Sequence, residues 1–147
     1  MVCLGNICRS PLAEGILQSK LSRKHFIVDS AGIGNYHIGG LPDYRSIAIA
    51  KNNGVDITAQ KARQFKVTDF DAFDYIYAMD RSNFNNIVKQ ARHDEDVSKV
   101  KLILDELIDF TLVDVPDPYY GGKQGFENVY HLLNEACTRI AIRLTAK

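Results

Sequence analysis

The sequence predicts a single α/β domain of 147 residues, built on a four-stranded parallel sheet with strand order 2-1-3-4 and helices on both faces. Short apolar segments alternate with helical patterns, which is typical of parallel β-α-β units. A loop suited to binding phosphate follows the first segment, and right-handed crossovers then favour this strand order, with a site at the carboxyl ends of the strands. A hydrophobic content of 46% in a chain of this length supports one domain with its own core.

The four expected strands are short. Strand one ends at Cys3, strand two covers residues 26–28, strand three covers 74–79, and strand four, at the sheet edge, covers 99–104. Only two residues precede Cys3, although a central strand must supply hydrogen bonds to two neighbours. We therefore expect that strand one is truncated here, and that the natural protein has about four to six further apolar residues upstream.

Four segments carry apolar side chains at helical spacing, and they cover residues 11–23, 43–53, 82–92 and 124–145. Gly54 directly follows the second of them, as expected for a left-handed helix stop. The fourth places its apolar side chains on one stripe, so we expect it to belong to the core. Residues 105–122, which precede it, are expected to run over the surface.

Composition excludes several classes of partner. The 18 Lys and Arg residues equal the 18 Asp and Glu residues, so we expect no nucleic acid and no membrane surface as partner. No apolar run approaches the roughly 20 residues of a membrane span, and the start lacks a signal-peptide pattern. Three Cys residues cannot form a disulfide framework, and the four His residues are scattered. We expect a cytoplasmic monomer without cofactor or metal.

The stretch most indicative of function is Cys3-Leu4-Gly5-Asn6-Ile7-Cys8-Arg9-Ser10, followed by Pro11. The five residues between Cys3 and Arg9 allow the backbone to curl with its amides pointing inward, and Ser10-Pro11 is typical of a helix start. Gly5 and Asn6 suit such a tight loop. Inward amides, a helix N-terminus and the Arg9 fork together form a binding site for a dianion such as phosphate.

Cys3 is the candidate nucleophile of this loop. A thiol at a helix N-terminus beside an arginine loses its proton readily, and a thiolate facing a phosphate ester can form a phosphocysteine. Alternatively, Cys3 and Cys8 are small buried apolar side chains or half of a zinc site, although the remaining cysteine, Cys137, is distant in sequence. A nucleotide-binding loop is a poor fit because the chain has no G-x-x-x-x-G-K-[ST] motif.

This stretch resembles the signature of the low-molecular-weight protein tyrosine phosphatases. Further segments resemble that family's blocks in the same order, namely residues 29–32, 62–64, 73–76 with 79–80, and 117–121. The resemblance runs from residue 2 to about residue 140. It implies hydrolysis of protein phosphotyrosine through a phosphocysteine, with Cys3 as nucleophile, Arg9 as phosphate clamp and Asp117 as general acid and base.

The role of Asp117 depends on the resemblance, because an Asp before Pro is also a common turn opener. The leaving phenolate has a conjugate acid with a pKa of about 10, so a proton donor near the ester oxygen matters. Asp117 matches the family's donor and would afterwards activate the hydrolytic water. Asp80 could cap the following helix or support the phosphate loop, and the two roles are compatible.

Other positions match supporting parts of the family's site. Ser30 resembles the serine that holds Asn6, and Ser10 is a further supporting residue. Many relatives carry a His two residues before Ala62, where this chain has Gln60, which can donate the same bond toward the loop but cannot titrate.

The substrate cleft is expected to be aromatic. Tyr36 lies in the glycine-rich segment 32–42, where it could form one wall of the cleft or pack against its own neighbours. Tyr119 and Tyr120 would flank the ring of a phosphotyrosine protein or a small aryl phosphate, in a cleft that a short phosphoserine fills poorly.

Cys8 is a redox candidate. The tight loop should bring it near Cys3, so that an oxidised Cys3 is captured as a reversible disulfide. The alternative is a thiol that only packs.

Three other functions are less favoured. A module that only binds phosphotyrosine would need the loop but not Asp117. Thiol-dependent arsenate reductases resemble this loop but use a further cysteine pair near the third strand and its helix, and residues 74–92 contain none. Protein arginine phosphatases also resemble it, but they tend to have Thr at the position of Ile7 and lack the Tyr119-Tyr120 pair.

Overall fold

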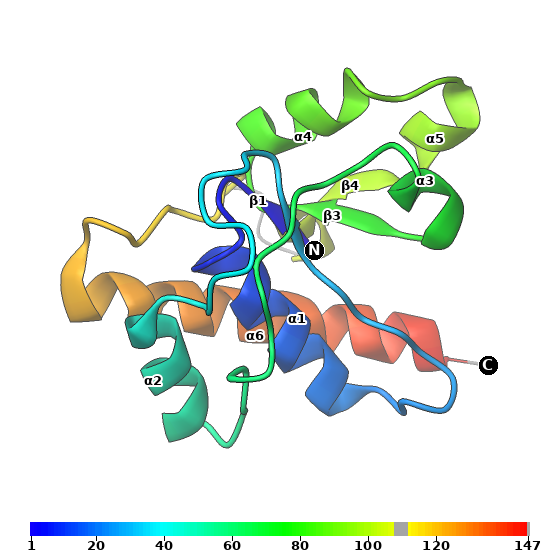
Figure 1. The fold of residues 1–147 in the computed structure, drawn as a ribbon. Helices are drawn as coiled ribbons and strands as arrows, with labels where there is room; N and C mark the ends of the chain where they lie inside the picture. The colour runs from blue at the N-terminus through cyan, green and yellow to red at the C-terminus, as the bar shows by residue number, and fades with distance from the viewer. Residues whose placement is uncertain (108–111, 147) are drawn as a thin grey trace.

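A four-stranded parallel sheet lies at the centre of the computed structural model, which describes residues 1–107 and 112–146 (Figure 1). The strands are β1 (Val2–Cys3), β2 (Ala31–Gly32), β3 (Ile76–Ala78) and β4 (Val100–Leu102), in the order β2-β1-β3-β4. In this register Val2 lies opposite Ala31 on one side and Ala78 on the other. The predicted fold class and strand order are thus confirmed.

Six α-helices and one 3-10 helix accompany the sheet in the described residues. They are α1 (Arg9–Lys20), α2 (Tyr44–Asn52), α3 (Asp69–Ala72), α4 (Arg81–Val88), α5 (Asp94–Ser98), the 3-10 helix η1 (Ile103–Glu106) and α6 (Gly122–Thr145). The four helices expected from sequence are present with shifted ends, whereas α3 and α5 are too short to give a clear helical period. None of the described helices is both long and apolar enough to cross a bilayer.

The helices cover both faces of the sheet, with α1 and α6 on one face and α3 and α4 toward the other (Figure 1). Because successive strand residues point to opposite faces, Tyr77 and Met79 join the apolar cluster with α1 and α6. Ile76 and Ala78 join the second cluster, which includes Phe70 of α3. The segment from Ile76 to Met79 therefore contributes side chains to both apolar clusters, as expected for a strand with neighbours on both sides.

The second strand was predicted at the wrong residues. Residues 26–28 are not a strand, and Ile27 is 84% exposed, although Phe26 and Val28 pack against the core. The register explains the difference, since β1 pairs with Ala31–Gly32, three residues after the apolar run 26–28.

The third and fourth strands are also shorter than expected. Residues 74, 75 and 79 fall outside β3, and the chain leaves the sheet after Leu102 to form η1. A short helical turn explains why Leu104 is buried although it no longer belongs to the edge strand.

Gly15 on α1 allows close packing against the segment that follows α2. A Cβ atom added there would lie 2.4 Å from Cγ2 of the buried Ile57 and 3.0 Å from Cγ1 of Val55. Gly125 on α6 lacks this constraint, because its added Cβ would approach no atom closer than 3.8 Å.

We predict that Gly15→Ala lowers the free energy of unfolding by about 1–3 kcal/mol through overpacking. Gly125→Ala, the matched control, should raise it by about 0.5–1 kcal/mol, because alanine favours the helix. Urea unfolding of both variants, compared at equal slope, checks this. A gain in stability for Gly15→Ala would contradict the close packing of α1.

Candidate active site

The segment between β1 and α1 turns its carbonyl groups outward. Four of them accept hydrogen bonds from neighbouring segments: Cys3 O from Ile33 N (2.9 Å), Leu4 O from Gly34 N (2.9 Å), Ile7 O from Asp43 N (2.7 Å) and Cys8 O from Ser46 Oγ (3.3 Å). No peptide bond in the described chain is cis, and in a trans peptide the N–H points away from the C=O. The N–H groups of residues 4, 5, 8 and 9 therefore point away from these four bonded carbonyl groups.

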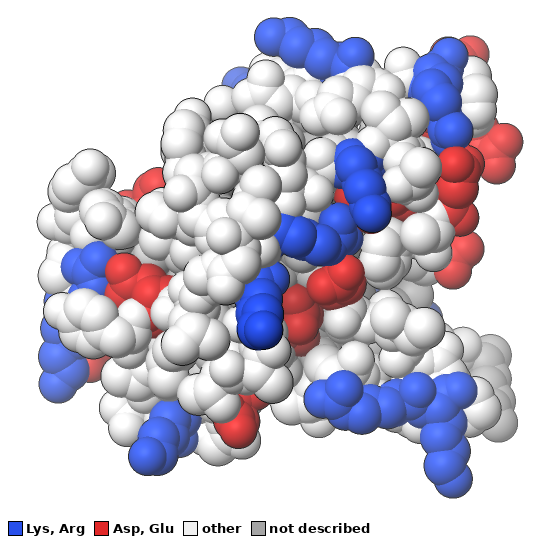
Figure 2. All heavy atoms as spheres, in the orientation of Figure 1, with Lys and Arg blue, Asp and Glu red and all other residues white. Residues whose placement is uncertain are grey.

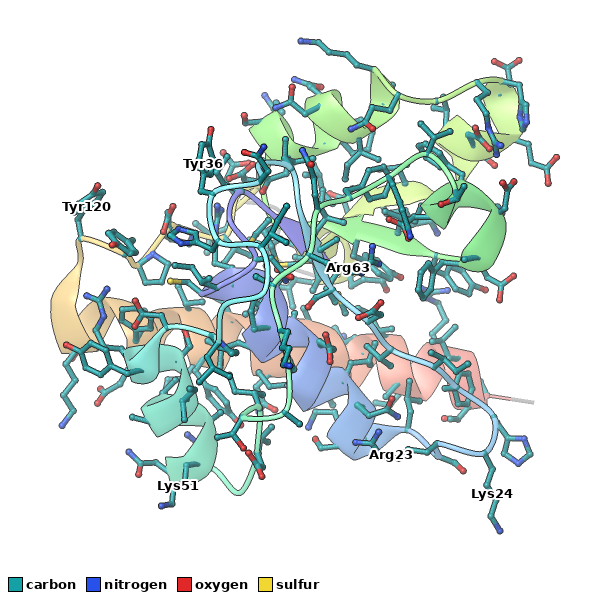
Figure 3. The ribbon with its side chains drawn as sticks, viewed as in Figure 1. Arg23, Lys24, Tyr36, Lys51, Arg63 and Tyr120 are labelled. Atoms are coloured by element: carbon teal, nitrogen blue, oxygen red, sulfur yellow. The ribbon has the colours of Figure 1, made fainter. Side chains whose placement is uncertain are left out.

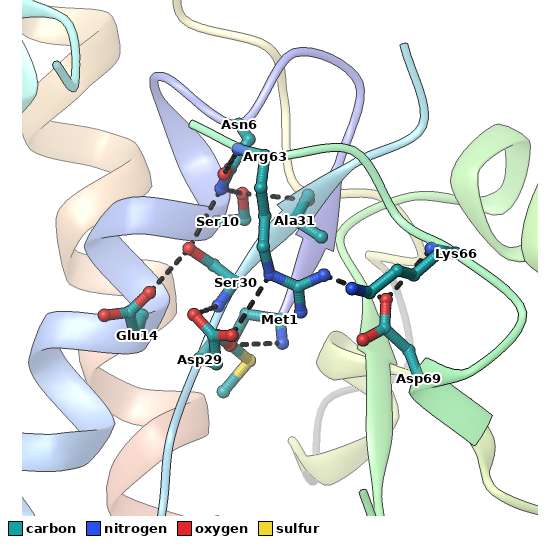
Figure 4. A network of polar contacts seen from close by, with 10 residues as sticks. All are labelled: Met1, Asn6, Ser10, Glu14, Asp29, Ser30, Ala31, Arg63, Lys66 and Asp69. Atoms are coloured by element: carbon teal, nitrogen blue, oxygen red, sulfur yellow. Dashed lines mark hydrogen bonds and ion pairs between the residues drawn. The ribbon is translucent and has the colours of Figure 1, made fainter. Parts of the chain in front are cut away.

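Asn6 holds this loop in place. Its backbone is left-handed (φ 56°) and its side chain is buried. The amide oxygen accepts from Arg63 N (3.0 Å), while Nδ2 donates to Ser10 Oγ (2.8 Å) and Ser30 Oγ (2.9 Å), as Figure 4 shows. The contact of Ser30 with Asn6 is the one that the resemblance implied.

The two serine hydroxyls must pass their own protons elsewhere, since each oxygen already accepts from Asn6. Ser30 donates to Glu14 Oε1 (2.6 Å), which lies on α1 (Figure 4). Ser10 Oγ lies 3.0 Å from Cys3 Sγ, and its other acceptor, Ala31 O, is more distant at 3.5 Å. Either atom of the Ser10–Cys3 pair can be the donor, and when Cys3 is a thiolate only the Ser10 hydroxyl can donate.

Glu14 is a part of this network that sequence reasoning missed. Burial raises the pKa of its carboxyl group, and the hydrogen bond from Ser30 opposes that shift. Its helical position gave no functional signal, because an acidic residue early in a helix is explained by the helix dipole alone.

Cys3 and Cys8 lie in different surroundings, although both are buried. The Cys3 sulfur accepts a hydrogen bond from Asn6 N (3.3 Å) and lies before the N-terminus of α1. Burial raises the pKa of Cys8 to about 12, and the charges of Asp43, Cys3 and Asp117 add to this. Cys8 is therefore a neutral thiol at neutral pH.

The zinc alternative has no ligand set in the described part of the chain, which contains no group of three or more His, Cys, Asp or Glu residues placed to hold a metal ion. Cys137 lies in the core on α6, where its thiol contacts Ala13 O at 3.7 Å.

Arg9 is a buried cation between two carboxylates. Its Nη1 donates to Asp80 Oδ2 (2.6 Å) and to Val115 O (3.0 Å), and its Nη2 lies 3.7 Å from Asp117 Oδ2. Burial alone would lower the pKa of Arg9, but the charges of Cys3, Asp80 and Asp117 together raise it. Asp80 Oδ1 also accepts from Asn83 N (2.7 Å), so this carboxylate both caps α4 and holds Arg9.

Asp117 lies at the open side of the loop, with its side chain 49% exposed. Its Oδ1 accepts from Tyr119 N (3.1 Å), so the turn expected from an Asp before Pro is present together with the contact to Arg9. Of the predicted surface segment 105–122, residues 108–111 lie outside the described residues.

The predicted cleft tyrosines are exposed. Tyr119 is 40% and Tyr120 is 95% exposed, and their rings meet edge to face at 4.9 Å. Tyr36 is 70% exposed and its ring also covers Gly34, so it both packs locally and faces solvent. Figure 3 shows Tyr36 and Tyr120 projecting from separate segments at one end of the molecule. Residues 31–42 contain no Lys, Arg, Asp or Glu, and the surface in this area is largely uncharged in Figure 2.

Gln60 contacts the helix rather than the loop. Its Nε2 donates to Pro11 O (3.1 Å) in the first turn of α1, and its buried Oε1 has no partner among the described residues. The bond that Gln60 makes therefore reaches the start of α1 and not the phosphate loop itself.

A cavity of about 520 Å³ lies at the amino ends of the strands, among residues that include Met1, Phe26, Tyr75 and Leu144. None of residues 3–9 lines it. The loop from Cys3 to Arg9, at the carboxyl end of β1, is therefore separate from this cavity.

The family model "Low molecular weight phosphotyrosine protein phosphatase" matches residues 1–147. The chain belongs to this family. It is 44% identical to the putative low molecular weight protein-tyrosine-phosphatase slr0328 of Synechocystis, with 97% of this chain and 93% of that protein covered.

Solved structures of phosphatases share the fold. A protein tyrosine phosphatase from Entamoeba histolytica with Hepes in its active site superposes with a TM-score of 0.91 at 36% identity, covering 97% of this chain and 93% of that one. A Drosophila arginine phosphatase superposes with a TM-score of 0.90 at 31% identity, covering 99% and 96%. The low molecular weight phosphatase fold thus carries more than one named specificity.

We predict that Asp80→Ala destabilises the protein by about 3–5 kcal/mol, because it leaves the buried guanidinium of Arg9 without its closest carboxylate. The matched control is Asp71→Ala, which removes a carboxylate from the exposed Arg92 and should change stability little. Urea unfolding of both variants measures the difference in the free energy of unfolding. Equal losses would show that the buried Arg9–Asp80 pair contributes no more to stability than the exposed Arg92–Asp71 pair.

Proposed function

We propose that the chain, as a single phosphatase domain over residues 1–147, hydrolyses phosphotyrosine in proteins and small aryl phosphates through a phosphocysteine. The observation that carries this proposal is the meeting of nucleophile, cation and acid at one loop, with Cys3 at its start, Arg9 at its end and Asp117 3.7 Å from Arg9. A module that only binds phosphate has no use for Asp117.

The phosphate loop would bind the dianion through the inward amides of residues 4–9 and through Arg9. Because Nη1 of Arg9 already contacts Asp80 and Val115, the remaining N–H groups of the guanidinium are the ones available to phosphoryl oxygens. Asp80 and Ser30 support the loop without touching the substrate.

In the first step the Cys3 thiolate attacks phosphorus and the bond to the phenolic oxygen breaks. Asp117, protonated, gives its proton to the leaving oxygen. In the second step the Asp117 carboxylate takes a proton from water, whose oxygen attacks phosphorus while the P–S bond breaks. Inorganic phosphate leaves, and Ser10 Oγ, 3.0 Å away, stabilises the departing thiolate by donating to it.

Tyr36, Tyr119 and Tyr120 would contact the ring of the substrate. Phosphoarginine is the competing substrate class, since a relative of the same fold is named an arginine phosphatase. The paired tyrosines and Ile7 favour an aryl leaving group. We place the activity in the cytoplasm, because a reducing compartment keeps the Cys3 thiolate available. We further propose that the chain acts as a monomer.

We predict that Cys3→Ser abolishes turnover of phosphotyrosine and that Asp117→Asn slows it according to the leaving group. The loss should be about 100- to 10,000-fold for a phenol with pKa near 10 and much smaller for an activated nitrophenol. Steady-state rates over a series of aryl phosphates, with phosphoarginine alongside, measure this. A uniform loss across the series would mean that Asp117 only shapes its loop, and faster turnover of phosphoarginine would overturn the substrate assignment.

We also propose that Cys8 protects Cys3 from irreversible oxidation. After peroxide converts Cys3 to a sulfenic acid, Cys8 sulfur attacks it and expels water, and a dithiol later reduces the disulfide. Burial, which raises the pKa of Cys8 to about 12, keeps its thiol protonated at neutral pH, so its attack on the sulfenic acid is slow. Dithiothreitol should restore less activity to Cys8→Ser than to the parent after equal peroxide treatment. Cys137→Ser is the control, and equal recovery in all three proteins would refute this role.

A further inference from the structure

Arg45 lies in an unusual place for a cation. It is in the first turn of α2, where the helix dipole disfavours positive charge. Its fork binds the carboxylate of the preceding cap residue, with Nε 3.0 Å from Asp43 Oδ1 and Nη2 3.0 Å from Asp43 Oδ2. Asp43 Oδ1 also accepts from Arg45 N (2.8 Å). The pair fixes the guanidinium in one orientation.

This fixed guanidinium lies among three aromatic rings. Its Cζ is 4.6 Å from the ring centroid of Phe126, 5.3 Å from that of Tyr119 and 5.7 Å from that of Tyr44. Phe126 is buried on α6, which lies beside α2 in Figure 1, whereas Tyr119 is exposed. Arg45 therefore lies against both a core ring and an exposed ring.

Tyr119 has little other aromatic support. Its partner Tyr120 is almost fully exposed and cannot hold it in place. The backbone of Tyr119 is tied to Asp117. The guanidinium of Arg45 is thus the planar group against which the Tyr119 ring rests.

The start of α2 also holds the phosphate loop. Asp43 N donates to Ile7 O (2.7 Å), and Ser46 Oγ donates to Cys8 O (3.3 Å). A short chain of contacts therefore runs from the loop through Asp43 and Arg45 to the Tyr119 ring. These contacts fix the position of the Tyr119 ring relative to the phosphate loop.

We propose that Arg45 is a positioning residue that sets the preference for aryl phosphates by holding Tyr119 in line with the phosphate loop. The proposal rests on the proposed function in that Tyr119 is taken as a wall of the substrate cleft. Arg45 does not itself hold the phosphate, because its fork is occupied by Asp43.

The test compares two ligands that share a phosphate-like group and differ in the ring. Inorganic phosphate needs only the loop, whereas benzylphosphonate also needs the wall. Calorimetric titration measures both without turnover, so the result does not depend on whether the chain hydrolyses phosphotyrosine. That activity is tested separately by the Cys3 and Asp117 variants.

We expect Arg45→Met to weaken benzylphosphonate binding by about tenfold. Phosphate binding should stay within about twofold of the parent. Arg45→Lys keeps the charge but not the planar fork, so it should lose most of the same affinity for benzylphosphonate. This second variant keeps the test valid if Arg45→Met folds poorly. Arg92→Met is the matched control, because the Arg92 fork is also held by carboxylates, those of Asp71 and Asp96, but lies beyond α4. Arg92→Met should change the affinity for neither phosphate nor benzylphosphonate.

A double-mutant cycle with Tyr119→Ala decides between positioning and direct contact. In the Tyr119→Ala background, Arg45→Met should have no further effect on benzylphosphonate. The proposal is overturned if the two ligands weaken together, if neither weakens, or if the effect of Arg45→Met is undiminished without the Tyr119 ring.

Discussion

Three hydrogen bonds of one buried amide, that of Asn6, connect the loop between β1 and α1 to three segments of the chain. The bonds reach Ser10 on α1, Ser30 before β2 and the backbone of Arg63. A buried polar group left without a partner costs about 1–3 kcal/mol, so the loop is held where all three bonds form. One of these bonds also holds the Ser10 oxygen 3.0 Å from the Cys3 sulfur, which links the shape of the loop to the surroundings of this thiol.

The charge of Arg9 is balanced before any substrate arrives. Its guanidinium is buried, and such a cation is stable only beside carboxylates such as Asp80. In the function we propose, Arg9 therefore orients the dianion more than it adds net attraction, because one of its terminal nitrogens is already bonded. The backbone amides of the loop would then contribute much of the affinity for the dianion.

Local patterns in the sequence were enough to predict the loop, the four long helices and the order of the strands. The register of β2 was not, because Ala31 is chosen by pairing with Val2 and not by its own neighbours. Asp80, 71 positions from Arg9, was named only through the family resemblance, and the contact of Ser46 with Cys8, 38 positions away, was not predicted at all. Glu14 and Arg45 gave no signal, because a charged residue on a helix is normally explained by solvent exposure.

The division of labour within the site explains how one fold carries several specificities. In the function we propose, phosphate is bound by backbone amides, and three of the four bonded loop carbonyls accept from backbone N–H groups, so that half of the site depends mainly on the fold. In the same proposal the leaving group is met by exposed side chains such as Tyr36 and Tyr120, whose replacement removes little buried area. A tyrosine phosphatase and an arginine phosphatase therefore superpose on this chain almost equally well, with TM-scores of 0.91 and 0.90. Specificity must then depend on how rigidly the exposed rings are held relative to the loop, and a contact such as that between Arg45 and Tyr119 is where selection could act without cost to the fold.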